Sequence, residues 1–128
     1  MRTLRSCACW GLMLLLGCSR GDAPLAPVQG QVLYRGQPLR GGTIVFTPDP
    51  ERGGHGPLAW AEITSDGRFH LCTDGRNGAT PGWHRVTIAP CKADRPASLP
   101  ARYLDPEQSG QHLEVKPERV NLFTLHLE

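Results

Sequence analysis

The sequence predicts an all-β domain built as a seven-stranded, two-sheet sandwich. Beyond residue 27, prolines recur so closely that helices of ordinary length have almost no room, and the one long gap between prolines carries glycines instead. The segments between these breakers show period-two alternation or enrichment in β-branched and aromatic residues, which is typical of short, half-buried strands. Seven such segments separated by regular turns favour a sandwich. The prolines are Pro38, Pro48, Pro50, Pro57, Pro81, Pro90, Pro96, Pro100, Pro106 and Pro117.

The first strand is predicted over residues 28–34. Val28, Gly30, Val32 and Tyr34 alternate there with more polar neighbours. A turn with glycine and proline at its centre ends this strand at residues 35–38, and a second strand is expected over residues 43–47, directly after two glycines.

The third and fourth strands, residues 59–64 and 68–73, are predicted to form a hairpin. They flank Ser65-Asp66-Gly67, and an Asp-Gly step between alternating runs is among the stronger short-range hairpin signals. Glycine is favoured there because it accepts a positive φ without steric cost.

A fifth strand is predicted over residues 83–89, with His84, Val86 and Ile88 on one face. The chain then runs through residues 90–112 without clear periodicity, which is uncommon inside a compact domain unless the segment is functional or packs as its own unit. Leu99 and Tyr103 are expected to hold this segment against a sheet edge.

Two more strands complete the predicted sandwich. A short one is expected over residues 113–115, and the last runs over residues 120–127. In the last strand Phe123, Leu125 and Leu127 share one face, which we expect to point into the core.

The N-terminus has the organisation of an export signal. Arg2 and Arg5 precede an apolar-leaning run over residues 6–16, whose length suits a signal h-region and is too short to span a bilayer. The step Leu15-Leu16-Gly17-Cys18 ends this run and resembles the lipobox of bacterial lipoproteins. That resemblance implies cleavage before Cys18 and acylation of its thiol. An ordinary secretory signal with an incidental cysteine is the alternative.

Three regions follow from this interpretation. Residues 1–17 are predicted to be a signal peptide, residues 18–27 a lipidated flexible tether, and residues 28–128 the sandwich. Three acyl chains on Cys18 would hold the protein stably in a bilayer. By resemblance, Ser19 after the cysteine argues against retention in an inner membrane, so we expect an outer-membrane anchor with the domain facing the periplasm or the cell surface.

Charge and cysteine content limit the other partners. Without Arg2 and Arg5, 12 basic side chains balance 12 acidic ones, so no nucleic-acid partner is expected. Two cysteines, Cys72 and Cys91, remain in the predicted sandwich. An oxidising envelope favours a disulfide between them, but spacing alone cannot establish its geometry, so two free, half-buried thiols are the preferred alternative.

The ordered motifs of the domain resemble a known family. The chain is similar to carboxypeptidase-regulatory-like (transthyretin-like) domains, and more narrowly to small bacterial lipoproteins built on that domain, across residues 28–127. This resemblance implies a seven-stranded immunoglobulin/transthyretin-like sandwich without catalysis. The sequence departs from the family pattern at His84, where the family more often has tyrosine, and at Cys72 and Cys91, which the pattern does not require. The motifs that carry it are Val28-x-Gly30-x-Val32, Gly36-x-Pro38-Leu39-x-Gly41-Gly42, Val45-Phe46 near Pro48, Asp66-Gly67-Arg68-Phe69, Gly78-Ala79, Gly82, Leu99-Pro100-Ala101-Arg102-Tyr103 with Ser109-Gly110, and Asn121-x-Phe123-x-Leu125-x-Leu127.

Enzymatic chemistry has weak support in the sequence. No Gly-x-Ser-x-Gly elbow is present, and the chain ends in Leu125-His126-Leu127-Glu128 rather than in the signature of transthyretin-like hydroxyisourate hydrolases. No cofactor is expected, and a metal-dependent enzyme is a distant third hypothesis because the soft ligands lack zinc-site spacing. Those ligands are His55, His70, His84, His112, His126, Cys72 and Cys91.

A binding role remains, with two alternatives. The first is an anchored, non-catalytic structural or protein-interaction module of the cell envelope. The second is a carbohydrate-binding lipoprotein, in which Trp60, Trp83 and Tyr103 supply aromatic platforms. His55, in the long polar loop over residues 48–57, is a further candidate ligand-binding residue. For each aromatic residue, packing in the core is the competing interpretation.

Overall fold

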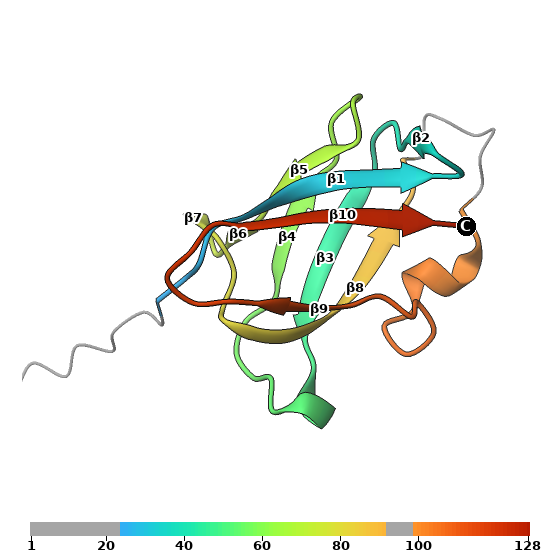
Figure 1. Cartoon of the computed structure of the whole chain (residues 1–128). Helices are drawn as coiled ribbons and strands as arrows, with labels where there is room; N and C mark the ends of the chain where they lie inside the picture. Colours follow the sequence, from blue (N-terminus) through green and yellow to red (C-terminus); the bar gives the residue numbers. More distant parts are fainter. Residues whose placement is uncertain (1–23, 92–98) are drawn as a thin grey trace, which may run out of the picture.

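The computed structural model describes residues 24–91 and 99–128 and consists of two β-sheets packed face to face. Ten strands and two short 3₁₀ helices make up this sandwich (Figure 1). No helix in these residues is long and apolar enough to cross a bilayer. The elements are β1 (Val28–Tyr34), β2 (Gln37–Pro38), β3 (Thr43–Pro48), η1 (Pro50–Arg52), β4 (Ala59–Glu62), β5 (Arg68–His70), β6 (Cys72–Thr73), β7 (Arg76–Asn77), β8 (Gly82–Ala89), η2 (Ala101–Leu104), β9 (His112–Val115) and β10 (Asn121–Leu127).

The smaller sheet is centred on β1. One side of β1 pairs with β10 in parallel, over seven register positions from Val28 opposite Asn121 to Tyr34 opposite Leu127. The other side pairs antiparallel with β5 and then with β2. The first and last strands of the described fold therefore lie side by side (Figure 1).

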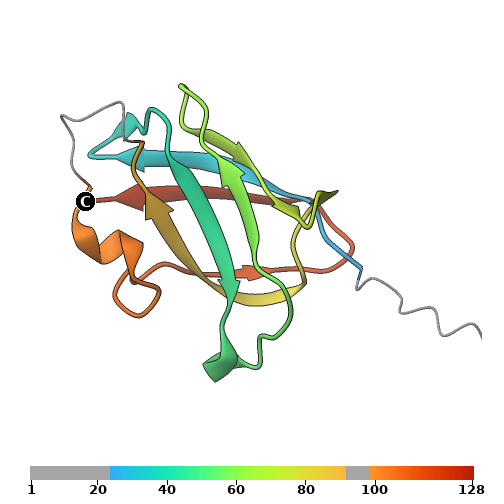
Figure 2. The same cartoon turned by 180° about the vertical axis from the view of Figure 1, so that it is seen from behind.

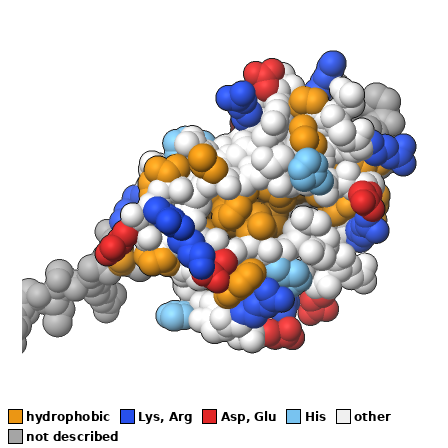
Figure 3. Space-filling model, viewed as in Figure 1, with side chains coloured by type: hydrophobic (Ala, Val, Ile, Leu, Met, Phe, Trp, Pro, Cys, Tyr) orange, Lys and Arg blue, Asp and Glu red, His pale blue; other side chains and the backbone are white. Residues whose placement is uncertain are grey.

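The larger sheet has the order β7-β6-β4-β3-β8-β9, and all its pairs are antiparallel. Seen from behind, β3 lies between β4 and β8 (Figure 2). At one side of the sandwich, β9 and β10 are edge strands of different sheets and do not pair. Hydrophobic side chains are visible in a hollow near the centre of the face shown in Figure 3.

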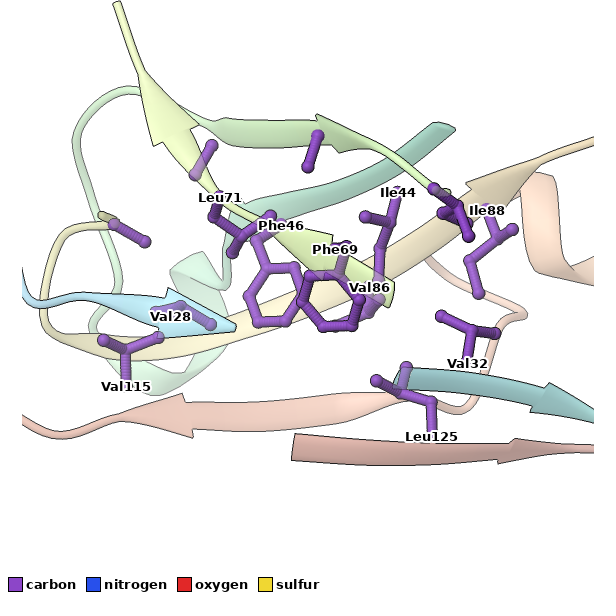
Figure 4. Packing of buried hydrophobic residues seen from close by; sticks show 14 of the residues in the cluster. Val28, Val32, Ile44, Phe46, Phe69, Leu71, Val86, Ile88, Val115 and Leu125 are labelled. Carbon is purple, nitrogen blue, oxygen red and sulfur yellow. The ribbon is translucent and has the colours of Figure 1, made fainter. Parts of the chain in front are cut away.

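The two sheets enclose a core centred on Phe46. Its ring lies 6.2 Å from that of Phe69, 6.1 Å from that of Phe123 and 5.8 Å from the imidazole of His84, measured between centroids. Aromatic contacts at these separations add to the stabilisation that burial provides. Aliphatic side chains from both sheets surround this centre (Figure 4).

The predicted all-β sandwich is confirmed, but the count of seven strands is wrong. The strand expected over residues 68–73 is divided at Leu71, because β5 pairs with β1 in one sheet and β6 pairs with β4 in the other. Two further strands, β2 and β7, are only two residues long. In the described part of the long aperiodic segment, Leu99 and Tyr103 are buried, as expected.

Candidate functional site

The predicted hairpin around Asp66-Gly67 is present. The backbone N–H of Thr64 donates to the Arg68 carbonyl at 2.8 Å, and that of Gly67 donates to the Thr64 carbonyl at 2.9 Å. The Thr64 hydroxyl accepts a third bond from the Arg68 N–H at 3.1 Å. Gly67 has a φ of +78°, so glycine is needed in this turn.

Beyond the turn, the two arms of the hairpin separate. β4 continues in the larger sheet beside β3, while β5 joins the smaller sheet beside β1. The arms meet again where Trp60 pairs with Cys72. The separation opens a groove of about 570 Å³, which we call the split-hairpin groove. It is lined by Gln29, Trp60, Ala61, Glu62, Thr64, Arg68, Phe69, His70 and Cys72.

Trp60 provides the exposed aromatic surface of this groove. It is 49% exposed, although large apolar side chains usually lie inside a fold. Leu58, two residues earlier, is 47% exposed, so apolar surface extends beyond the strand. An exposed indole beside polar groups is suited to stacking on a ring while its neighbours form hydrogen bonds.

Charged side chains from both arms line the same groove. Glu62 comes from β4 and Arg68 from β5, and both are exposed. Within residues 24–91 and 99–128, neither side chain forms an ion pair. The groove therefore offers an unpaired carboxylate and an unpaired guanidinium on opposite arms.

His70 is held in place by a side-chain contact. Its Nε2 lies 2.5 Å from Oδ1 of Asn77. Because an amide oxygen accepts hydrogen bonds, this contact favours the tautomer with the proton on Nε2. Cys72 is half-buried at the end of the groove, and no group of three or more metal-ligating side chains exists in the described part of the chain.

Two smaller depressions adjoin the split-hairpin groove. One, of about 370 Å³, lies over Gly30 between β5 and β10, and the other, of about 420 Å³, lies beside the hairpin turn. Arg68 lines both of them as well as the groove itself. Arg68 therefore lies where the three concave surfaces meet.

The other three predicted ligand-binding residues lie outside the groove. The Arg52 guanidinium lies 4.6 Å from the centre of the Trp83 ring, so this half-buried indole already has a cationic neighbour. Tyr103 is only 3% exposed, and its hydroxyl accepts a hydrogen bond from the Glu128 N–H at 3.0 Å. His55 is exposed in the β3–β4 loop. The structure thus gathers none of these three residues around Trp60.

Sequence reasoning missed an ion cluster around Asp49. The predicted loop over residues 48–57 contains η1, and the Asp49 side chain, 2% exposed, lies at its N-terminus. The Arg85 Nε lies 3.1 Å from the Asp49 carboxylate, at ion-pair distance but without hydrogen-bond geometry. His112 Nδ1 and Arg52 Nε lie 3.6 Å and 3.8 Å away. The Asp49-Pro50 step is the signal that could have revealed a cap.

Cys72 and Cys91 are both free thiols, so no disulfide joins them. Cys91 lies beside Gly41, where an added Cβ would come within 3.4 Å of the Cys91 Cβ, whereas Cys72 pairs with Trp60 and so lies near Val45. Gly41 and Val45 are four positions apart, about 13 Å of extended chain. In addition, β4 and β3 lie between β6, which carries Cys72, and β8, which ends two residues before Cys91. A disulfide requires Cα atoms within about 7 Å. The predicted lipidation site, Cys18, lies outside the described residues.

Comparisons with known proteins leave the family open. No family model and no curated protein matches the chain. Among solved structures, a DUF3823 family protein from Parabacteroides merdae is similar over 83% of this chain, with 18% sequence identity and a TM-score of 0.46. The similarity covers 47% of that protein, so this chain spans about half its length.

Proposed function

We propose that this protein is a lipid-anchored, non-catalytic binding module of the cell envelope, built on a carboxypeptidase-regulatory-like sandwich. The observation that carries the proposal is the Leu15-Leu16-Gly17-Cys18 step after a short apolar run, with an ordered β-sandwich beginning at Val28. The intervening residues 18–27 are long enough to hold the domain away from a membrane.

The anchor is tested by the intact mass of protein extracted from membranes of cells that express the full chain. We expect a mass that begins at Cys18 and includes acyl chains. A Cys18→Ala variant serves as the control and should be recovered without lipid. A wild-type mass without lipid, or with residues 1–17 retained, would contradict the anchor.

The interaction role is tested by crosslinking in cells. With several crosslinkers of different length, we expect the wild-type protein to yield a recurrent adduct with one envelope protein. Recovery of the uncrosslinked chain alone under all conditions would count against a protein-interaction module. The Cys18→Ala variant should lose the adduct, since it would no longer be held at the membrane.

Carbohydrate recognition is a second candidate function, favoured by Trp60. Its indole is half-exposed, and Gln29, Glu62 and Arg68 line the same groove. Sugar rings present an apolar face and several hydroxyls, so they fit a surface that combines an aromatic ring with amide and charged groups.

The test compares two tryptophans that sequence reasoning could not separate. Across a panel of cell-wall and extracellular polysaccharides, Trp60→Ala should abolish binding to any glycan that the wild-type protein retains. Trp83→Ala is the matched control and should leave that binding unchanged, because its ring is already stacked against Arg52. Absence of binding across the panel would remove this second candidate.

A further inference from the structure

Arg68 occupies an unusual position among the cations of the described residues. It lines the split-hairpin groove and both adjoining depressions. In the depression over Gly30 it is the one charged lining residue, beside the amides of Gln29 and Gln31. An anion that lies at the junction of these surfaces would meet this guanidinium from any of the three.

The guanidinium is also available. No carboxylate in the described ranges pairs with it, and the turn hydrogen bonds at this residue use its backbone N–H and carbonyl. A free guanidinium presents a planar set of donors that matches both oxygens of a carboxylate. Glu62 lines the groove on the opposite arm and can accept hydrogen bonds from hydroxyl groups.

The spacing between Trp60 and Arg68 sets the size of the ligand. Arg68 lies opposite Thr64 in the hairpin, and Trp60 precedes Thr64 by four residues. At about 3.3 Å per residue, the backbone positions of Trp60 and Arg68 are offset by about 13 Å along the hairpin. This offset exceeds the width of one sugar ring, which favours a ligand whose stacked ring and carboxylate belong to different sugars.

We infer that the split-hairpin groove binds a segment of an acidic polysaccharide, in which Trp60 stacks on one sugar ring and Arg68 pairs with the carboxylate of another. This inference rests on the second candidate function and adds to it a ligand class and a minimum length. It also makes Arg68 the residue that distinguishes acidic from neutral glycans.

The experiment uses a galacturonic acid tetramer and its methyl ester, which share a backbone and differ in charge. Calorimetric titration of the detergent-solubilised full chain should show the acid binding at least about tenfold tighter than the ester. Arg68→Gln should remove this preference, and Arg68→Lys should keep part of it. Arg35→Gln, the loss of a guanidinium at the far end of β1, should leave it intact.

The number of sugars in the ligand gives a second readout. Galacturonic acid monomer should bind at least about tenfold more weakly than the tetramer, and Trp60→Ala should weaken the tetramer and its ester alike. Because both side chains are exposed, thermal unfolding should be unchanged in the Arg68 and Trp60 variants.

Four results would overturn the inference. Equal binding of acid and ester, or a preference that survives Arg68→Gln, would exclude Arg68 as the acidic determinant while leaving carbohydrate recognition in place. If the protein bound only a neutral glycan and Trp60→Ala abolished that binding, Arg68 would again be excluded as the acidic determinant and carbohydrate recognition would stand. Absence of binding to every glycan would remove both the inference and the second candidate function.

Discussion

Gly30 shows how closely β1, β5 and β10 approach one another. A Cβ at this position would lie 2.1 Å from the Phe123 carbonyl oxygen and 2.9 Å from the tip of the Phe69 ring. Backbone cannot move away as a flexible side chain would. We expect Gly30→Ala to lower the free energy of unfolding by about 2–4 kcal/mol, measured by urea denaturation.

The neighbouring Gln29→Ala substitution is the control for this prediction. Gln29 is exposed on the outer face of the sheet, so its loss should change stability by less than about 0.5 kcal/mol. If Gly30→Ala were as stable as Gln29→Ala, the close approach of the strands would be contradicted.

His84 is a buried titratable group next to the ring of Phe46. Burial lowers its pKa below the ordinary value of 6.5, and the carbonyls of Thr80 and Phe46 oppose that shift. The unfolded chain therefore binds this proton at a higher pH than the native protein does. The contribution of the neutral, buried His84 to the free energy of unfolding is therefore complete above about pH 6.5 and is lost as the pH falls below that value.

This linkage is measured as the slope of unfolding free energy against pH. Between pH 7 and 5.5, wild-type stability should fall more steeply than that of His84→Gln, by no more than about 1.4 kcal/mol per pH unit. His126→Gln removes an exposed histidine and should keep the wild-type slope. Identical slopes for the wild type and His84→Gln would show that His84 has an unshifted pKa.

At the scale of elements, the β3–β4 loop is attached to the larger sheet through Asp49. Its carboxylate faces Arg85 on β8 and His112 on β9, and its side chain also caps η1 through the Glu51 N–H at 3.1 Å. Asp49→Asn keeps a side-chain oxygen that can cap η1. It removes the main carboxylate partner of Arg85, whose side chain is largely buried. We expect a loss of about 2–3 kcal/mol in unfolding free energy.

Glu51→Gln tests whether the stability loss expected for Asp49→Asn depends on the burial of that carboxylate or only on removing a negative charge beside Arg85. Glu51 also pairs with Arg85, at 3.2 Å, but its side chain is 82% exposed. Its removal should change stability by less than about 1 kcal/mol. Equal effects of the two substitutions would mean that the buried carboxylate contributes no more than a surface ion pair.

The elements also show what the sequence could reveal. The Asp-Gly hairpin and the inward face of His84, Val86 and Ile88 follow from local rules and are present. The division at Leu71 could not be predicted, because inward and outward residues alternate without interruption from β5 into β6. The same pattern fits one strand in one sheet or two strands in different sheets.

At the candidate site, local sequence rules identify single residues but not their grouping. Trp60 could be identified because it is an aromatic residue in a predicted strand. Its grouping with Gln29 and Arg68 depends on the pairing of β5 with β1, which brings together residues distant in sequence. From the sequence, Asp49 belongs only to a long polar loop, because its partners, Arg85 and His112, come from strands much later in the chain.

At the scale of the whole molecule, Phe46 joins the two sheets through contacts with Phe69 and Phe123 on the opposite sheet. Phe46→Ala would leave a cavity between the layers. We expect a loss of about 3–5 kcal/mol, measured by urea denaturation, whereas Phe46→Leu should cost less. Equal stability of the alanine variant and the wild type would contradict the central position of this ring.

The parallel pairing of β1 with β10 also has a mechanical consequence. The two strands begin at the same end of the sandwich, so the start of β1 and the end of β10 lie at opposite ends of one ladder (Figure 1). Tension applied between the start of β1 and the C-terminus would pull the strands past each other along their length. Seven register positions would then share the load in shear, instead of opening one after another as in a peeling geometry. A module held to a membrane by its N-terminus would in this way resist being pulled apart in the direction of its attachment.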